Sequence, residues 1–289
     1  MTDFQFTNFA PSPARGRVLV FDSGVGGLTV AEEIRALGPA LGVHYAADSG
    51  FFPYGDKSDE ALQERLPRVA KLLCDHVRPD VFVIACNTAS TLALEDIRAV
   101  LDIPVVGTVP AIKPAAAFSE TGTIGLLATP GTIRRAYTAR LINEFAGDRR
   151  VIMHGSIELV RLAEAHARGD DVPIEAIAAA QAPLFEAPGG DQIDTVVLAC
   201  THFPLVRGQL IASAPHGVSY VDSGAAIARQ TIRVLPPETE ARGIGGSAYL
   251  TSPPEESPDL ALVLRRYGFP DVHLVALDPI AMTSAPIAL

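Results

Sequence analysis

VIACNT at residues 83–88 returns in the second half of the chain as VLACTH at residues 197–202. In each copy a short apolar run ends at a cysteine, Cys86 or Cys200, and two polar residues follow the cysteine. Apolar runs of this length are typical of strands that a parallel sheet buries on both faces. The repeat therefore predicts two α/β lobes of similar build, and it predicts that both thiols face one pocket.

Short β-branched runs alternate with longer segments of helical pattern along the rest of the chain. This alternation is typical of parallel βαβ units. The helical pattern at residues 62–77 has one apolar stripe, in which Pro67 predicts a kink or a break. The predicted strands lie at residues 18–21, 43–47, 81–85, 105–106, 124–128, 151–154, 196–199 and 219–221.

The predicted fold class is α/β, with two pseudo-symmetric α/β lobes, mainly parallel sheets and an active site in the cleft between the lobes. VDSG at residues 221–224 echoes FDSG at residues 21–24, so we expect the chain to return to the first lobe near its end. We assign residues 1–16 to a loose leader, 17–109 and 218–289 to the first lobe, and 110–217 to the second lobe. Residues 236–258, rich in Pro, Glu, Gly and Ser, are expected to form a surface loop, and residues 260–277 a last helix and strand.

Composition and charge exclude several classes of protein. No uninterrupted apolar stretch approaches the roughly 20 residues that cross a bilayer, and the first 16 residues have no pattern of a secretory signal. The net charge of −10 opposes binding to nucleic acid and to anionic membranes, so an anionic substrate needs local attraction. Three cysteines without a disulfide framework favour a reducing, cytoplasmic location.

The polar residues of interest follow the predicted strands. In open parallel sheets, ligands collect beyond the carboxyl ends of the strands. We therefore expect one cleft to collect the candidate substrate-binding residues Asp22, Ser23, Tyr54, Gly55, Asn87, Thr88, Thr201 and His202 around the two cysteines.

Cys86 and Cys200 are the candidate catalytic residues. A pair of acid/base groups on opposite sides of a substrate can remove a proton from one face and return one to the other, as racemisation requires. Helix N-termini and nearby hydrogen-bond donors raise the thiolate fraction of a cysteine. Asp22 and His202 are the candidate assistants, one near each thiol. The alternative is that these residues are only structural: the cysteines small buried residues, Asp22 a structural aspartate and His202 a core histidine. We assign the third cysteine, Cys74, to packing because it lies in the body of a predicted helix.

The glycine-rich turn at residues 22–27 allows backbone amides to approach an anion, and an amino-acid carboxylate would fit there. Thr29 stands where a dinucleotide-binding fingerprint has its third glycine, which disfavours a nucleotide. A metal site would use the two cysteines and His202, but no C-x-x-C pair supports one. A pyridoxal phosphate enzyme would need a suitable lysine, and the chain has only Lys57, Lys71 and Lys113. We expect neither a cofactor nor a metal.

Four motifs in order give the chain a family resemblance: FDSGVGGLTV at residues 21–30, PYG at 53–55, IACNTA at 84–89 and ACTHFPL at 199–205. Together they resemble glutamate racemases of the aspartate/glutamate racemase superfamily. The similarity extends over GTIGLLATPGTIRRAY at residues 122–137 and VDSGAAIAR at 221–229.

The resemblance implies an isomerase that interconverts L- and D-glutamate without cofactor or metal, and that supplies D-glutamate for peptidoglycan and hence for cell wall biogenesis and cell shape. It implies that Cys86 handles the proton of the D-isomer and Cys200 that of the L-isomer. It also implies a cytoplasmic protein, with a homodimer as one possible state.

The chain departs from the family pattern in places. DSGFF at residues 48–52 replaces a more usual D-T-A. Glu164 matches a family glutamate only loosely, so we leave it outside the candidate site. The tail beyond about residue 238 matches no part of the family pattern. A racemase of aspartate or another small acid is the nearest alternative, since one methylene contributes only about 1–3 kcal/mol to discrimination. The C-T-H triplet favours glutamate, and a non-catalytic amino-acid sensor is the alternative from another class.

Overall fold

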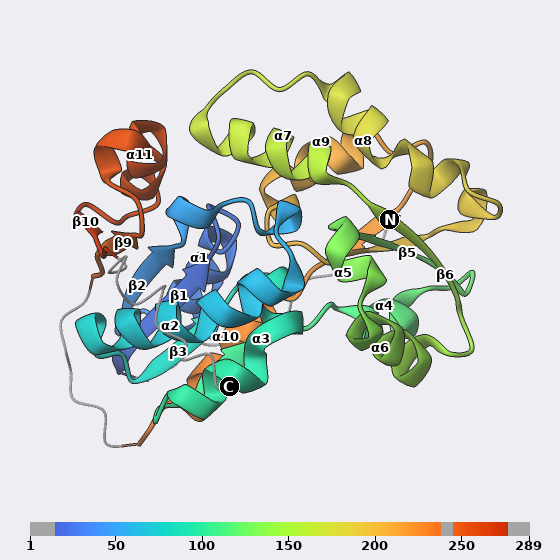
Figure 1. Cartoon of the computed structure of the whole chain (residues 1–289). Helices are drawn as coiled ribbons and strands as arrows, with labels where there is room; N and C mark the ends of the chain where they lie inside the picture. Colours follow the sequence, from blue (N-terminus) through green and yellow to red (C-terminus); the bar gives the residue numbers. More distant parts are fainter. Residues whose placement is uncertain (1–14, 238–244, 277–289) are drawn as a thin grey trace, which may run out of the picture.

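The computed structural model describes residues 15–237 and 245–276. Two lobes, each built on one parallel sheet, lie side by side (Figure 1). The first sheet has the order β10-β9-β2-β1-β3-β4 and the second the order β6-β5-β7-β8. The predicted α/β class with parallel sheets is confirmed. The expected leader, residues 1–16, lies outside the described residues except for its last two, of which Gly16 already begins β1.

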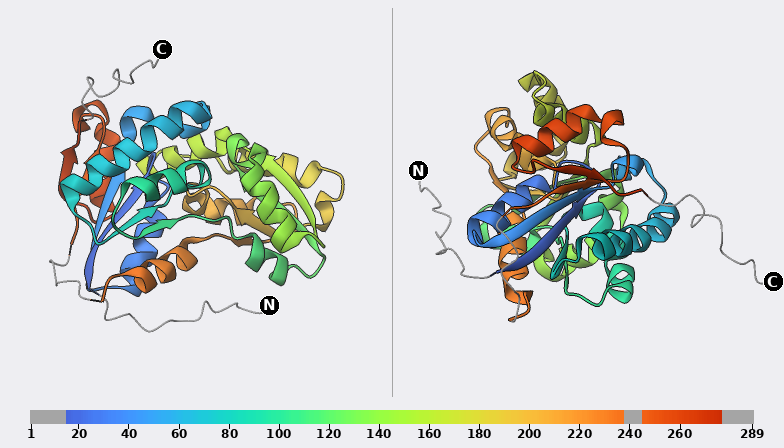
Figure 2. Two further views of the ribbon diagram at one scale, coloured as in Figure 1. Left: turned by 60° about the horizontal axis from the view of Figure 1, so that its bottom comes forward. Right: turned by 90° about the vertical axis from the view of Figure 1, so that its left-hand side faces the viewer.

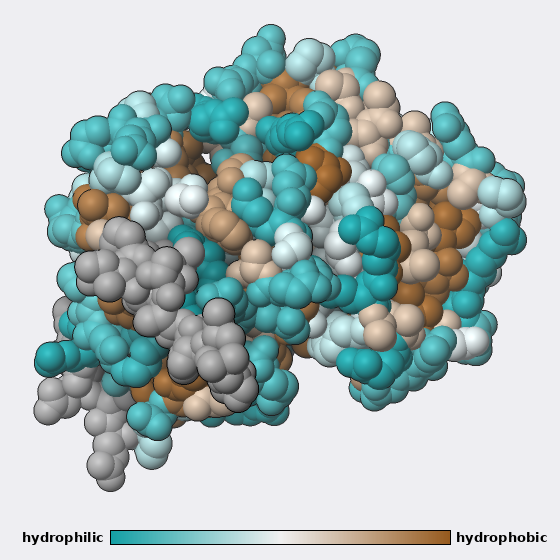
Figure 3. All heavy atoms as spheres, in the orientation of Figure 1, coloured by the Kyte–Doolittle hydropathy of each residue, from teal (hydrophilic) through white to brown (hydrophobic). Residues whose placement is uncertain are grey.

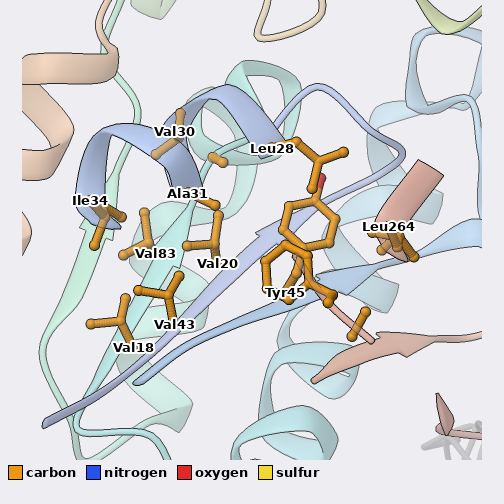
Figure 4. Packing of buried hydrophobic residues seen from close by; sticks show 14 of the residues in the cluster. Val18, Val20, Leu28, Val30, Ala31, Ile34, Val43, Tyr45, Val83 and Leu264 are labelled. Carbon is orange, nitrogen blue, oxygen red and sulfur yellow. The ribbon is translucent and has the colours of Figure 1, made fainter. Parts of the chain in front are cut away.

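The first lobe buries its sheet between two layers of helices. Its strands are β1 (Gly16–Asp22), β2 (Leu41–Ala47), β3 (Val81–Ile84), β4 (Val105–Gly107), β9 (Ala248–Leu250) and β10 (Val272–Leu274). Its helices are α1 (Leu28–Leu37), α2 (Asp59–Val77), α3 (Asn87–Val100), α10 (Gly224–Val234) and α11 (Pro258–Arg266). Successive side chains of a strand point to opposite faces. Accordingly Val18 and Val20 pack against α1 (Figure 4), whereas Leu19 and Phe21 pack against α2.

The second lobe repeats this plan with four strands. They are β5 (Thr123–Ala128), β6 (Arg150–Gly155), β7 (Thr195–Leu198) and β8 (Ser219–Val221). Its helices are α4 (Ile112–Phe118), α5 (Pro130–Arg134), α6 (Ala136–Ala146), α7 (Ile157–Arg168), α8 (Ile174–Glu186) and α9 (Arg207–Ala212). The run β6-β5-β7-β8 has the same connectivity as β2-β1-β3-β4, so β3 and β7 hold equivalent positions. The two cysteines that follow β3 and β7 are therefore related by the pseudo-symmetry of the fold.

The strands predicted from the sequence are all present, and two details differ. β9 lies inside the segment 236–258 that was expected to be a surface loop, and its residues are buried because they extend the first sheet beside β2. Of the kink or break predicted at Pro67, a break is absent, since α2 runs from Asp59 to Val77. The buried leucines and valines of α2 each contribute up to about 1.5–3 kcal/mol, which together outweighs the roughly 3 kcal/mol that an internal proline costs.

The chain crosses between the lobes near its end. β8, which lies in the segment assigned to the first lobe, pairs with β7 in the second sheet. α10 then returns to the first lobe, where Ile227 and Ala228 join the core beside α1, and the orange helix in Figure 2 follows this return. The face drawn in Figure 3 is mostly hydrophilic, with apolar residues interspersed. Within the described residues, no helix combines the length and the hydropathy that a membrane span needs.

Candidate active site

One pocket, of about 210 Å³, collects residues that follow strands of both sheets. Its volume is below the roughly 300–1,000 Å³ typical of sites for drug-sized ligands, which suits a small metabolite. Cys86 and Cys200 both line it, so the fold brings the two repeated cysteines to one site. The described residues of the lining are Ser23, Phe52, Pro53, Tyr54, Gly55, Asp56, Cys86, Asn87, Thr88, Thr129, Ile157, Val160, Arg161, Ala199, Cys200, Thr201 and His202.

Cys86 lies at the N-cap of α3 and is 6% exposed. Burial and, to a smaller extent, the nearby charge of Asp22 raise the pKa of this thiol to about 12. The backbone N–H of Ala89 and the hydroxyl of Ser23, whose Oγ lies 4.0 Å from Sγ, lower the pKa but do not offset the burial. The helix N-terminus was expected to favour the thiolate, yet at neutral pH Cys86 is a thiol because desolvation is the larger effect.

Cys200 has a histidine, His202, beside its sulfur. The 3-10 helix η4 (Phe203–Val206) begins directly after His202 and leads into α9. Nδ1 of His202 lies 3.9 Å from Sγ, and Nε2 lies 2.7 Å from Oε1 of Glu164. Burial lowers the pKa of His202, but its hydrogen bonds to Cys200 and Glu164 and the charge of Glu164 raise it well above the usual value. A protonated imidazole therefore lies beside the sulfur.

Glu164 is the functional residue that sequence reasoning left out. It lies on α7, is 8% exposed, and also accepts a hydrogen bond from the N–H of Val25 at 3.1 Å. Burial raises the pKa of this carboxyl, but the hydrogen bond and charge of His202 and the N–H of Val25 outweigh the burial and lower it. The sequence held one sign of this role, because Glu164 lies four residues after Val160 on the apolar face of an otherwise amphipathic helix.

The glycine-rich turn holds a carboxylate of the protein. A Cβ added at Gly24 would lie 2.3 Å from Oε1 of Glu164, and one added at Gly26 would lie 2.5 Å from Nδ1 of His202. Only glycine allows such close approach. The N–H of Val25 donates to Glu164, so this amide of the turn serves a carboxylate of the protein. The binding of a substrate carboxylate at the turn stays a prediction.

Asp22 connects the two lobes behind the pocket. Its Oδ2 accepts a hydrogen bond from Oγ1 of Thr201 at 3.0 Å, and its Oδ1 accepts one from the N–H of Gly24 at 2.8 Å. Burial raises the pKa of this carboxyl, against the lowering effects of the charge of His202 and of these two hydrogen bonds. Asp22 is not among the described residues that line the pocket, so it acts on Cys86 through its charge.

The other predicted substrate-binding residues line the pocket, with differing freedom to bind. Oδ1 of Asn87 is buried and has no hydrogen-bond partner among the described residues, which leaves this acceptor available to a donor from a ligand. Oγ1 of Thr88 lies 3.4 Å from Oγ1 of Thr129. The hydroxyl of Tyr54 donates to Asp48 at 2.7 Å and is therefore not free to donate to a ligand.

Further lining residues come from segments that had no motif in the sequence. α7 contributes Ile157, Val160 and Arg161, and the loop after β2 contributes Phe52, whose ring centroid lies 6.1 Å from that of His202. Their position depends on how α7 packs over the strand ends, which local patterns do not specify.

Comparisons with known proteins show the family of the chain. Residues 29–231 match the Asp/Glu/hydantoin racemase family. A glutamate racemase of Escherichia coli O139:H28 is 45% identical over 269 residues, which cover 92% of this chain and 94% of the relative. One from Sphingopyxis alaskensis is 46% identical over 259 residues, 89% and 97% of the two chains. The crystal structure of E. coli glutamate racemase with L-glutamate and the activator UDP-MurNAc-Ala has a TM-score of 0.84 at 44% identity, and covers 91% of this chain and 99% of the other.

Proposed function

This chain belongs to the Asp/Glu/hydantoin racemase family, and we propose that its substrate is glutamate, which it interconverts between the L- and D-forms by a two-cysteine mechanism. It is an amino-acid racemase and therefore an isomerase. Glutamate as the substrate is supported by the identities of 45% and 46% to relatives named glutamate racemase. The observation that carries the mechanism is that Cys86 and Cys200, from equivalent positions of the two lobes, line one pocket.

The reaction needs one base and one acid. A cysteine thiolate removes the α-proton of glutamate and becomes a thiol, and the electron pair stays on the α-carbon. The other cysteine then donates its S–H proton to the opposite face and is left as a thiolate. Atoms and charges balance without any group from outside the chain, and positioned acid/base groups of this kind contribute about 10²–10⁴-fold each.

The surroundings of the two sulfurs assign the first roles. The raised pKa of Cys86 keeps it protonated and ready to donate. His202, held by Glu164, lies beside Sγ of Cys200, where a cationic imidazole can stabilise the negative charge that forms on sulfur during proton transfer. In the conversion of the L-isomer into the D-isomer, Cys200 is accordingly the proposed base and Cys86 the proposed acid.

Polar groups of the pocket lining hold the substrate. We assign contacts to the substrate to Ser23, Asn87, Thr88, Thr201 and His202, and to the backbone of Tyr54 and Gly55. Asn87 is the clearest of these, because its buried Oδ1 gains a partner when a substrate ammonium group donates to it. D-glutamate made in this way would supply peptidoglycan synthesis in the cytoplasm, a role supported by the family resemblance.

The test is racemisation by the purified protein. We expect circular dichroism to show L-glutamate and D-glutamate each relaxing to the racemate, with one solvent deuteron at Cα in heavy water. Cys86→Ala and Cys200→Ala should each lose at least about 10²-fold in kcat/KM. Cys74→Ala is the matched control, since Cys74 is also buried but lies in α2, away from the pocket, and its rate should stay unchanged.

The alternatives give distinct results. Wild-type rates from Cys86→Ala in heavy water would refute the two-cysteine mechanism. Racemisation of aspartate in place of glutamate would keep the mechanism and change the substrate. No reaction with either amino acid would favour a sensor.

A further inference from the structure

The segment after β9 lies against the loop that lines one side of the pocket. β9 pairs with β2 in parallel, in a register that sets Leu250 opposite Ala47. The residues that follow continue this pairing through their side chains, so Thr251 meets Asp48 and Ser252 meets Ser49. Residues 203 positions apart in sequence therefore meet one by one at the carboxyl end of the first sheet.

Asp48 is fully buried and its carboxylate accepts four hydrogen bonds. Arg65 donates through Nε and a terminal nitrogen, both at 2.7 Å, and Tyr54 donates its hydroxyl at 2.7 Å. The fourth donor is Oγ1 of Thr251, at 2.6 Å. A buried carboxylate with a full set of donors fixes the positions of all the groups around it.

Thr251 also holds the loop directly. Its Oγ1 accepts a hydrogen bond from the N–H of Gly50 at 3.0 Å, so one hydroxyl donates to Asp48 and accepts from the loop that follows it. Beside it, Oγ of Ser252 and Oγ of Ser49 lie 2.6 Å apart, and the N–H of Ser252 donates to the same Oγ of Ser49 at 3.1 Å.

The loop held in this way reaches the pocket. It contains Phe52, Pro53 and the turn Tyr54–Asp56, all of which line the pocket. Tyr54 is joined to Asp48 by its hydroxyl, so Asp48 is the point at which the C-terminal segment and the pocket wall meet.

We propose that Thr251, from the C-terminal segment of the chain, is a positioning residue of the racemase that fixes the substrate-binding loop 49–56 through Asp48 and Gly50. This inference rests on the proposed function, because the loop matters only if its turn holds the substrate. Thr251 does not line the pocket and takes no part in proton transfer. A looser loop weakens the binding of the substrate and the binding of the transition state by a similar amount. This raises KM and leaves kcat nearly unchanged.

Thr251→Val tests this, because valine keeps the shape of threonine and removes the hydroxyl. We expect KM for both enantiomers to rise about tenfold, as is typical when a hydrogen bond to a charged group is lost, with kcat within about twofold and the pH profile of kcat unchanged. Thr251→Ser keeps the hydroxyl and should restore KM. Thr231→Val is the matched control, since its fully buried hydroxyl also donates one hydrogen bond, to the carbonyl of Ile227, but lies in α10.

Each outcome decides the inference. The inference is overturned if Thr251→Val and Thr231→Val both fold and have the same KM. It is also overturned if Thr251→Ser does not restore the wild-type KM. If Thr251→Val does not fold, Thr251→Ala decides, since it also removes the hydroxyl that contacts Asp48 and Gly50, and an unchanged KM there overturns the inference. A wild-type protein that does not racemise glutamate refutes the proposed function instead, and that result is visible before any variant is made.

Discussion

Replacing Glu164 by glutamine isolates the charge that keeps His202 protonated. Glutamine has the shape of glutamate, and its amide oxygen can still accept hydrogen bonds from His202 and from the N–H of Val25. What the variant loses is the negative charge of a side chain that is only 8% exposed. The pKa of His202 then falls, because the carboxylate that offsets the burial of the imidazole is gone.

The expected magnitude follows from the contact that loses its charge. A hydrogen bond to a charged group contributes about 1.5–3 kcal/mol, and a neutral one about half as much. The 2.7 Å contact between His202 and Glu164 therefore loses about 0.8–1.5 kcal/mol, which lowers kcat/KM about four- to twelvefold. The alkaline limb of the pH profile moves to lower pH, since His202 loses its proton earlier.

Circular dichroism at 25 °C in both directions measures this change. The two enantiomers have equal free energies in water, so the equilibrium constant is one and kcat/KM must fall by the same factor for L- and D-glutamate. Glu144→Gln is the control, because Glu144 is an exposed glutamate on α6 and its removal should change nothing. An unchanged rate together with an unchanged alkaline limb for Glu164→Gln would refute the assignment of His202 as the charged partner of Cys200.

Two further predictions test the glycine turn and a buried histidine. Gly26→Ala places a Cβ 2.5 Å from Nδ1 of His202, so kcat/KM should fall by at least about tenfold. Gly208→Ala is the control and should keep wild-type activity, because no described atom lies within 4 Å of the added Cβ. Equal activities of the two variants would contradict the close packing at Gly26. Burial lowers the pKa of His44 from 6.5 to about 4, so the unfolded chain takes up a proton that the folded protein does not, and stability should fall as the pH drops from 6.5 towards 4. His44→Asn should flatten this dependence in urea unfolding, and an identical slope in both proteins would count against the assignment.

The sequence predicts those features that local patterns decide. The apolar runs before Cys86 and Cys200 form strands that a parallel sheet buries on both faces. The repeat of an apolar run followed by a cysteine was therefore enough to predict two equivalent strands. β9 was missed because three residues, Ala248–Leu250, form a strand only when β2 offers an edge to pair with, and that edge is far away in sequence. Long-range pairing of this kind leaves little trace in the local composition.

Glu164 was missed for a related reason. α7 packs over the pocket from the second lobe, and only this packing brings its glutamate to His202 and to the turn of the first lobe. The position of Glu164 on an apolar helix face indicates a buried carboxylate, and a buried carboxylate needs a hydrogen-bonded or charged partner. The sequence names no such partner, because His202 lies 38 positions further on.

The symmetry of the fold and the asymmetry of the charges have separate roles. The repeated strands bring two equal sulfurs to one pocket, and two equal sulfurs would leave the first proton transfer undirected. The burial of Cys86 near Asp22 raises the pKa of its thiol, whereas the sulfur of Cys200 lies beside His202, which Glu164 holds. Equal free energies of the enantiomers prevent this asymmetry from favouring either product at equilibrium. In the proposed mechanism it bears instead on how each sulfur gives up or takes up its proton, and the protonation state left after each turnover from L-glutamate is the one that accepts D-glutamate.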